Sequence, residues 1–268
     1  MLRIRYHGVE EYEQLPRFEC LAGGVLDGDD LGCLSELGTL LAIADSWRRF
    51  AVCLLHKHVV PRHGELFVEQ SVAGEKRTET SPVRRSTLGR PVSPVTIRFQ
   101  DCSGPAPQIV GLEYADLHPW EPTAAFCDED EPVLAGIAHR LREYDKLDRF
   151  GLKLIRNHLH MDVSELVLET CDSGTRAVHC RVVPRTALLA AGSTVETTWQ
   201  WRVAGGGPRV VIMRDCVAAC VPVPGAQGPT RALNCAPERV LSLNADQSRY
   251  MGTVQKCGDH STTAAGPM

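Results

Sequence analysis

Two histidines and two glutamates in a short span have the types and spacing of a metal site. His56 and His58 are separated by one residue, and Glu65 and Glu69 follow the turn-forming stretch 61–64. Alternate side chains of a strand share a face, so a His-x-His pair presents both imidazoles on one side. Two imidazoles and a carboxylate are a ligand set for Fe(II) or Zn(II). The segment therefore predicts a mononuclear metal site.

The choice of carboxylate depends on a predicted β-hairpin, in which strands 51–60 and 65–70 flank the turn. If Val60 pairs with Glu65, the residue opposite His56 is Glu69, and directly opposite residues share a face. A slip of one residue would move these side chains to opposite faces. In this register the predicted metal ligands are His56, His58 and Glu69.

A bound iron would activate oxygen and a bound zinc would activate water, with Glu65 as the catalytic base or as a partner of the ligands. We therefore expect a metal-dependent enzyme, with an iron oxygenase or related oxidoreductase favoured over a hydrolase. The alternative is a non-catalytic binding or assembly protein. In that case, the histidines and glutamates only pair with each other within the hairpin.

The same segment occurs twice in the chain at an offset of 100 residues. Arg49 and Phe50 recur as Arg149 and Phe150, and the match extends over one helix and the predicted hairpin. The identical pairs between residues 34 and 69 are Leu34/Leu134, Leu41/Leu141, Asp45/Asp145, Arg49/Arg149, Phe50/Phe150, Leu54/Leu154, His58/His158, Glu65/Glu165, Leu66/Leu166 and Glu69/Glu169. The chain thus contains an internal duplication of a unit of about one hundred residues.

The second copy keeps only part of the predicted metal site. It retains His158 as a further candidate ligand, but Arg156 stands where the first copy has His56. Arg156 opposite Glu169 would be an ordinary cross-strand ion pair. His160 restores a His-x-His spacing, shifted along the strand. A metal site is therefore predicted more strongly in the first copy than in the second.

The elements around the two segments indicate an α+β fold. Each copy reads as a helix, a β-hairpin and further antiparallel strands, with the helices near 29–44 and 132–144. Two such units predict two similar halves packed as a pseudo-dimer, at 1–120 and 121–220, with a small-molecule ligand at their interface. Residues 221–268 are rich in proline, glycine and small polar residues, which predicts an irregular, partly disordered tail.

Eleven cysteines are scattered through the chain without a Cys-x-x-Cys pair. Several lie in apolar runs, where a thiol behaves as a small buried hydrophobe. Cys216 and Cys220, with Cys235 further on, offer part of a thiolate metal site. Their spacing is not that of the common zinc ribbons, so this site is the weaker hypothesis.

Composition limits the remaining classes of function. The chain has 268 residues, of which 43% are hydrophobic and 23% charged, with a formal net charge of -4. The chain is weakly acidic and has no long run of basic residues, so its charge gives no support to a nucleic-acid or anionic-membrane partner. No apolar run has the ~20 residues needed to span a bilayer, and the N-terminus lacks a signal-peptide core. We expect a soluble, cytoplasmic protein.

Overall fold

A computed structural model gives the fold and describes residues 2–18, 26–72, 74–100, 108–116, 125–156, 159–187, 194–204, 211–220 and 241–242. The helices are α1 (Val9–Glu13), α3 (Gly28–Ile43) and α4 (Glu131–Glu143), with 3-10 turns η1 (Arg85–Thr87) and η3 (Asp128–Asp130). The strands are β1 (Ile4–Tyr6), β2 (Phe50–Leu54), β3 (Glu65–Ser71), β4 (Arg77–Arg84), β5 (Ser93–Gln100), β6 (Gln108–Ala115), β7 (Phe150–Leu154), β8 (Glu165–Asp172), β9 (Ala177–Pro184), β10 (Val195–Ala204), β11 (Val211–Cys220) and β12 (Leu241–Ser242).

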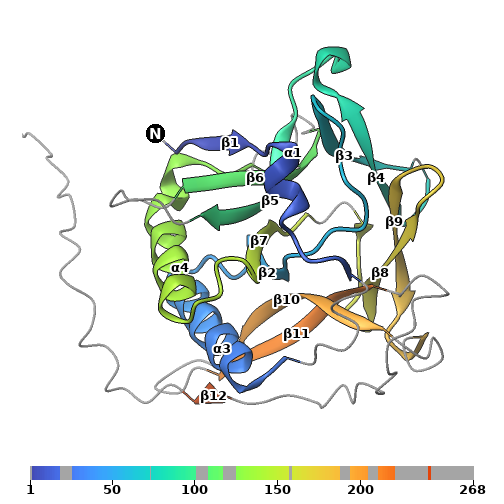
Figure 1. The fold of residues 1–268 in the computed structure, drawn as a ribbon. Helices are drawn as coiled ribbons and strands as arrows, with labels where there is room; N and C mark the ends of the chain where they lie inside the picture. The colour runs from blue at the N-terminus through green and yellow to red at the C-terminus, as the bar shows by residue number, and fades with distance from the viewer. Residues whose placement is uncertain are drawn as a thin grey trace, which may run out of the picture.

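Strands β2 to β11 form one closed barrel. Their order is β6-β3-β4-β9-β8-β11-β10-β2-β7-β5, and a further pairing of β5 with β6 joins the two ends (Figure 1). The short strands β1 and β12 pair with β6 and β11. The structure is thus mostly sheet, and closure leaves the ten strands without a free edge. The predicted α+β fold, with two halves packed as a pseudo-dimer, is therefore wrong.

The barrel combines the strands of both sequence repeats in a symmetric order. Strands β2 to β6 of the first repeat correspond to β7 to β11 of the second, close to the offset of 100 residues. If each strand is replaced by its counterpart, the closed order of the ten strands stays the same. An approximate two-fold axis therefore passes between β4 and β9 and between β2 and β7. Both helices also end alike, since Asp45 and Asp145 have φ of 50° and 55°.

The predicted hairpin is also wrong, because β2 and β3 do not pair with each other. Strand β2 pairs with β7 and β10, and β3 pairs with β4 and β6. All five residues of β2 are buried, as expected of a strand with covered faces and a neighbour on each side. Residues 55–64 form the connection that separates the two strands. The register that placed His56 opposite Glu69 therefore does not exist.

The main hydrophobic core lies outside the barrel, beneath α3 and α4. These two helices lie side by side against one wall, which includes β2, β7 and β10 (Figure 1). Phe50, Val52 and Leu54 alternate along β2 and join this core, together with Phe150 and Trp199. The intervening side chains point into the barrel, because successive strand residues face opposite ways.

Reciprocal ion pairs fasten the helices to the strands of the opposite repeat. Arg49 pairs with Asp130 at the start of α4, and Arg149 Nη2 lies 2.5 Å from Asp30 Oδ2 near the start of α3. Both aspartates are buried, and each arginine immediately precedes a core strand. Carboxylates at helix N-termini also complement the helix dipole. Each arginine thus links its own repeat to the helix of the other repeat, which gives the repeated arginines a structural role.

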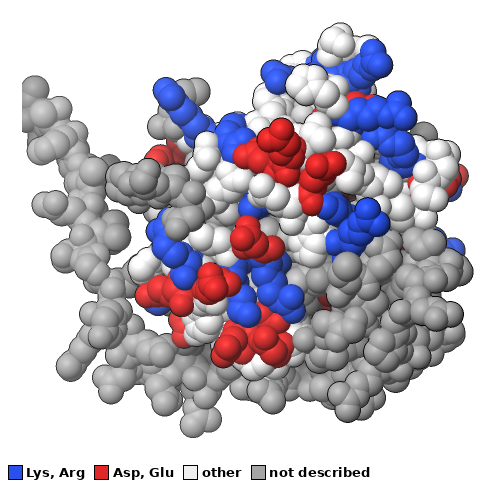
Figure 2. Space-filling view, in the orientation of Figure 1, with Lys and Arg blue, Asp and Glu red and all other residues white. Residues whose placement is uncertain are grey.

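Two further expectations concern the ends and the surface of the molecule. The predicted irregular tail, 221–268, falls outside the described residues except for Leu241–Ser242. Among the described helices, none combines the length and apolar character required to cross a membrane. Figure 2 shows acidic and basic side chains intermixed over the described part of one face.

Candidate metal centre

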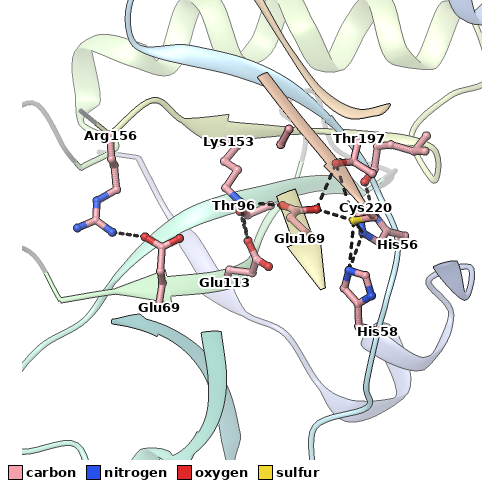
Figure 3. A network of polar contacts seen from close by, with 12 residues as sticks. His56, His58, Glu69, Thr96, Glu113, Lys153, Arg156, Glu169, Thr197 and Cys220 are labelled. Atoms are coloured by element: carbon pink, nitrogen blue, oxygen red, sulfur yellow. Dashed lines mark hydrogen bonds and ion pairs between the residues drawn. The ribbon is translucent and has the colours of Figure 1, made fainter. Parts of the chain in front are cut away.

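Four side chains from both repeats converge on the inner side of the barrel. His56 and His58 come from the segment after β2, Glu169 from β8, and Cys220 from the end of β11 (Figure 3). One potential ligand atom of each residue lies within 4.8 Å of those of the other three. Glu169 and Cys220 are buried, and the histidines are half-buried. These four residues could hold a metal ion.

Strand pairing sets the positions of the two buried donors. Strands β8 and β11 run parallel, with Glu169 in register with Cys220. Both side chains face inward, toward the segment that carries the histidines (Figure 3). That segment is held in turn by the N-terminal residues, since Lys57 N donates to Pro16 O and Phe18 N donates to Lys57 O.

Three of the distances between donors, those among His56, His58 and Cys220, are close to those around a four-coordinate ion. His56 Nε2 lies 3.1 Å from His58 Nε2, and Cys220 Sγ lies 3.4 Å and 3.5 Å from these two nitrogens. Bonds of ~2.0–2.3 Å in a tetrahedron place neighbouring ligand atoms roughly 3.3–3.8 Å apart. Cys220 Sγ also donates to Glu169 Oε2 at 2.6 Å. A metal ion would replace this shared proton and lengthen that contact.

The orientation of His56 leaves its outer nitrogen available as a ligand. Its Nδ1 lies 2.8 Å from the carbonyl oxygen of Leu54, which can only accept a hydrogen bond. Nδ1 therefore carries the proton in the neutral ring, and Nε2 presents its lone pair to the other donors. A backbone carbonyl commonly orients metal-binding histidines in this way. The buried ring of Phe18 packs against both imidazoles, with centroids at 5.5 Å and 5.4 Å.

The surroundings favour a carboxylate and neutral imidazole before any ion binds. Burial disfavours the charged form of Glu169, but Lys153 and His56 outweigh it and hold the pKa at about 2. Burial and the neighbouring His56 lower the pKa of His58 to about 4. Burial and Glu169 raise the pKa of the Cys220 thiol well above its usual range. The Cys220 thiol must therefore lose a proton against its surroundings to become a ligand, whereas Glu169 and His58 need not.

Five charged side chains, Glu169 among them, form three ion pairs in the barrel interior around the site (Figure 3). Lys153 Nζ lies 3.5 Å from Glu113 Oε2 and 3.9 Å from Glu169 Oε1. Arg156 Nη1 lies 2.6 Å from Glu69 Oε1. The interior thus holds three carboxylates and two basic groups, for a formal charge of -1.

The structure separates the residues predicted from the sequence. It brings His56 and His58 together, but Glu69 pairs with Arg156 and does not join them. Glu65 lies at the start of β3, where Arg176 Nη2 is 2.8 Å from its Oε2. His158 lies outside the described residues. The expected pairing of Arg156 with Glu169 is replaced by its pairing with Glu69.

The two donors missed by sequence reasoning come from the opposite repeat. Glu169 is the counterpart of Glu69, so the repeat held a signal that the glutamates have equivalent positions. The spacing of Cys220 from Cys216 and Cys235 predicts at most a thiolate cluster. Its approach to the histidines depends on how β8, β11 and β2 share one barrel, which no local spacing encodes.

Comparison with models of protein families, with curated protein sequences and with solved structures found no match for this chain.

Proposed function

We propose that the protein binds one divalent transition-metal ion, zinc in preference to iron, through His56, His58, Glu169 and Cys220. The observation that supports this proposal is the convergence of four ligand atoms within 4.8 Å from three separate segments. The ion would connect the first repeat, which supplies the histidines, to the second, which supplies the other two donors. Such a cross-link stabilises the folded barrel, because binding free energy adds to folding free energy.

The donor set supports zinc as the preferred ion. Two imidazoles, one thiolate and one carboxylate are ligands that Zn²⁺ accepts in tetrahedral geometry. Calcium and magnesium favour oxygen ligands and higher coordination numbers. An iron oxygenase uses two histidines and one carboxylate with open positions, whereas Cys220 supplies a fourth protein donor. We therefore place zinc before iron.

The charges inside the barrel support a divalent ion. Lys153 and Arg156 face three carboxylates, Glu69, Glu113 and Glu169, which leaves a formal charge of -1. A divalent ion that displaces the Cys220 proton adds one net positive charge. The interior then becomes formally neutral, which lowers the cost of burying charges away from water.

A metal-dependent enzyme is the second candidate, supported by a cavity beside the site. This cavity, of about 50 Å³, is lined by His56, His58 and Glu169 and also by Lys153 and Glu113. It has room for water. Hydrolysis by a zinc-bound water would require an exchangeable position on this side of the ion. The oxidoreductase reaction expected from the sequence would require open positions for oxygen and substrate.

Metal analysis tests the proposal directly. Protein purified without chelator and dialysed against metal-free buffer should retain about one equivalent of zinc by plasma mass spectrometry. The variants His58→Ala and Cys220→Ala should lose it. His63→Ala and Cys53→Ala are matched controls, because neither residue belongs to the cluster, and both should retain zinc.

The possible outcomes test the identity of the ligands separately from the identity of the metal ion. Absence of metal from the wild-type protein, with no binding of added zinc, would overturn the proposal. Equal metal content in all four variants would place the ion elsewhere. Iron in place of zinc, lost from the same two variants, would support the site and overturn the preference for zinc.

A further inference from the structure

A second cavity lies inside the barrel, related to the metal-side cavity by the approximate two-fold axis. Its volume is about 90 Å³, and Lys153, Glu169, Cys180 and Thr198 contribute to the walls of both cavities. Strands of both repeats line it. Most of its lining is apolar, including Ala51, Val95, Leu154, Val167, Met161 and Ala218. This second cavity is therefore a candidate binding site between the repeats.

The two cavities differ in how they are bounded. Tyr12 of α1 lines the metal-side cavity, and Phe18 covers the histidines beside it. No residue of α1 is among the described residues that line the second cavity, whose wall instead includes Leu159 and the half-buried Met161. Methionine adapts its shape to apolar ligands. The second cavity thus has a partly apolar, adaptable wall, and the Glu69–Arg156 ion pair stands where the first has its ligand cluster.

The charged groups on this wall are already paired. Arg156 lies 2.6 Å from Glu69, and Lys153 lies 3.5 Å from Glu113. With the divalent ion the interior is formally neutral, and any charged ligand would add an uncompensated charge. Without the ion the interior is already negative, and an anion would add to that charge. Burying such a charge is costly. The cavity therefore favours a neutral ligand.

One polar group on the wall can orient such a ligand. The half-buried amide of Gln200 makes no hydrogen bond within the part of the chain that the structure describes. Its counterpart, Gln100, is engaged: it accepts from Arg5 Nη2 at 2.5 Å and donates to Glu11 Oε1 at 3.2 Å. The side chain of Gln200 offers both a donor and an acceptor. A single hydroxyl or carbonyl group on the ligand suffices to bond with it.

We propose that the second cavity binds a small, neutral and mainly apolar molecule that carries one hydroxyl or carbonyl group, which hydrogen-bonds to Gln200. The apolar lining supplies affinity, and the amide selects an oxygen-bearing ligand over a hydrocarbon. Glu169 lines both cavities, but the polar group proposed to bind the ligand, Gln200, and the neighbouring Ala51 line only the second cavity.

Titration with phenol and benzene tests the proposal on the full-length, metal-loaded protein. Chemical shifts in two-dimensional NMR spectra report binding and its position. Phenol should bind more tightly than benzene, and benzoate should not bind. Gln200→Leu should weaken the binding of phenol about tenfold, as the loss of one hydrogen bond predicts. The affinity for benzene should stay the same or increase. Ala51→Leu, which fills the cavity from β2, should abolish binding of both.

The contrary outcomes are distinct. Failure of phenol and benzene to bind up to their solubility limits would show a cavity that holds only water and overturn the proposal. Unchanged phenol affinity in both variants would place binding elsewhere and overturn it as well. If Ala51→Leu fails to fold, Gln200→Leu decides alone through the ratio of phenol to benzene affinity. Zinc content, measured in the same samples, reports the metal proposal separately.

Discussion

Cys220 donates a hydrogen bond from Sγ to Glu169 Oε2 at 2.6 Å, across the parallel pair β11 and β8. The same pair of strands in the first repeat, β6 and β3, places Ala115 in register with Glu69. In each repeat, two parallel strands thus form an equivalent frame around a glutamate. Only the frame around Glu169 carries a thiol, that of Cys220. Its histidine partners come from the first repeat, whereas the other frame meets Arg156. One symmetric scaffold therefore produces one metal site and one ion pair.

Cobalt substitution tests the thiolate ligand. Co(II) bound at the site should show the intense near-ultraviolet absorption of a thiolate-to-cobalt charge transfer, because Cys220 binds as a thiolate. Cys220→Ser should remove this absorption, and Cys53→Ala should leave it intact. Titrations followed by absorption spectroscopy measure both. A spectrum of wild-type protein without the charge-transfer band would show that the sulfur is not a ligand.

Proton release should accompany zinc binding and give the affinity a defined pH dependence. The pKa of Cys220 is raised by burial and by Glu169, so the thiol is protonated near neutral pH and must lose its proton to bind. The pKa of His58 is lowered to about 4, so this ring adds no competing proton above about pH 5. Lowering the pH therefore weakens binding, by up to tenfold per unit from Cys220 alone.

Calorimetry in two buffers of different ionisation enthalpy counts these protons. At pH 7.5, roughly physiological, the wild-type protein should release one proton more per zinc than Cys220→Ser. Equal release by the two proteins would contradict a thiol that is protonated before zinc binds.

The two equivalent glutamates should respond differently to the same substitution. Glu169→Gln should lose zinc, because the carboxylate is a proposed ligand. Glu69→Gln should keep zinc but lower the free energy of unfolding by roughly 3–5 kcal/mol, because Arg156 stays buried without its carboxylate. Urea unfolding and zinc content measure the two effects. Loss of zinc from Glu69→Gln alone would favour the ligand set predicted from the sequence.

The repeat and the histidine pair were visible in the sequence because both are local patterns. Identity at a fixed offset marks equivalent elements, and a His-x-His spacing brings two rings near each other in many local conformations. The fold class was not accessible in this way. Barrel closure depends on β5 pairing with β6, and on β2 pairing with β7 of the other repeat. These contacts join strands whose order in space is not their order in sequence.

The ligand set predicted from the sequence is wrong in Glu69 for the same reason. A hairpin is the simplest pairing for two strands joined by a short turn, and it made Glu69 the partner of His56. In the structure, β2 ends at Leu54, so His56 leaves the sheet and meets donors from β8 and β11. The choice between Glu69 and Glu169 depended on which repeat faces the histidines. That is a property of the two-fold arrangement, which a single segment does not reveal.

Two glycines of α3 should respond differently to replacement by alanine. A Cβ at Gly38 would overlap the indole of Trp201, a fully buried side chain of β10, so Gly38→Ala should destabilise the protein by about 1–3 kcal/mol. At Gly32 the nearest atom is Tyr144 Cε1 at 3.4 Å, an ordinary contact. Gly32→Ala should therefore be neutral or stabilise by up to about 1 kcal/mol. Thermal and urea unfolding compare the two, and equal effects would contradict this packing.

Two substitutions can remove the difference between the repeats, which tests whether residue types alone decide where the metal site forms. Arg156→His with Ala115→Cys gives the frame around Glu69 the residue types of the frame around Glu169, and His158 is the counterpart of His58 in the sequence. The double variant should bind a second equivalent of zinc, because β3 and β6 hold Glu69 and position 115 in the same register as Glu169 and Cys220. Either single variant should bind one equivalent. Plasma mass spectrometry counts the zinc, and Cys220→Ala in the double-variant background should reduce the count from two to one. A double variant that folds, by circular dichroism, but binds only one zinc would show that the two frames are not equivalent in geometry.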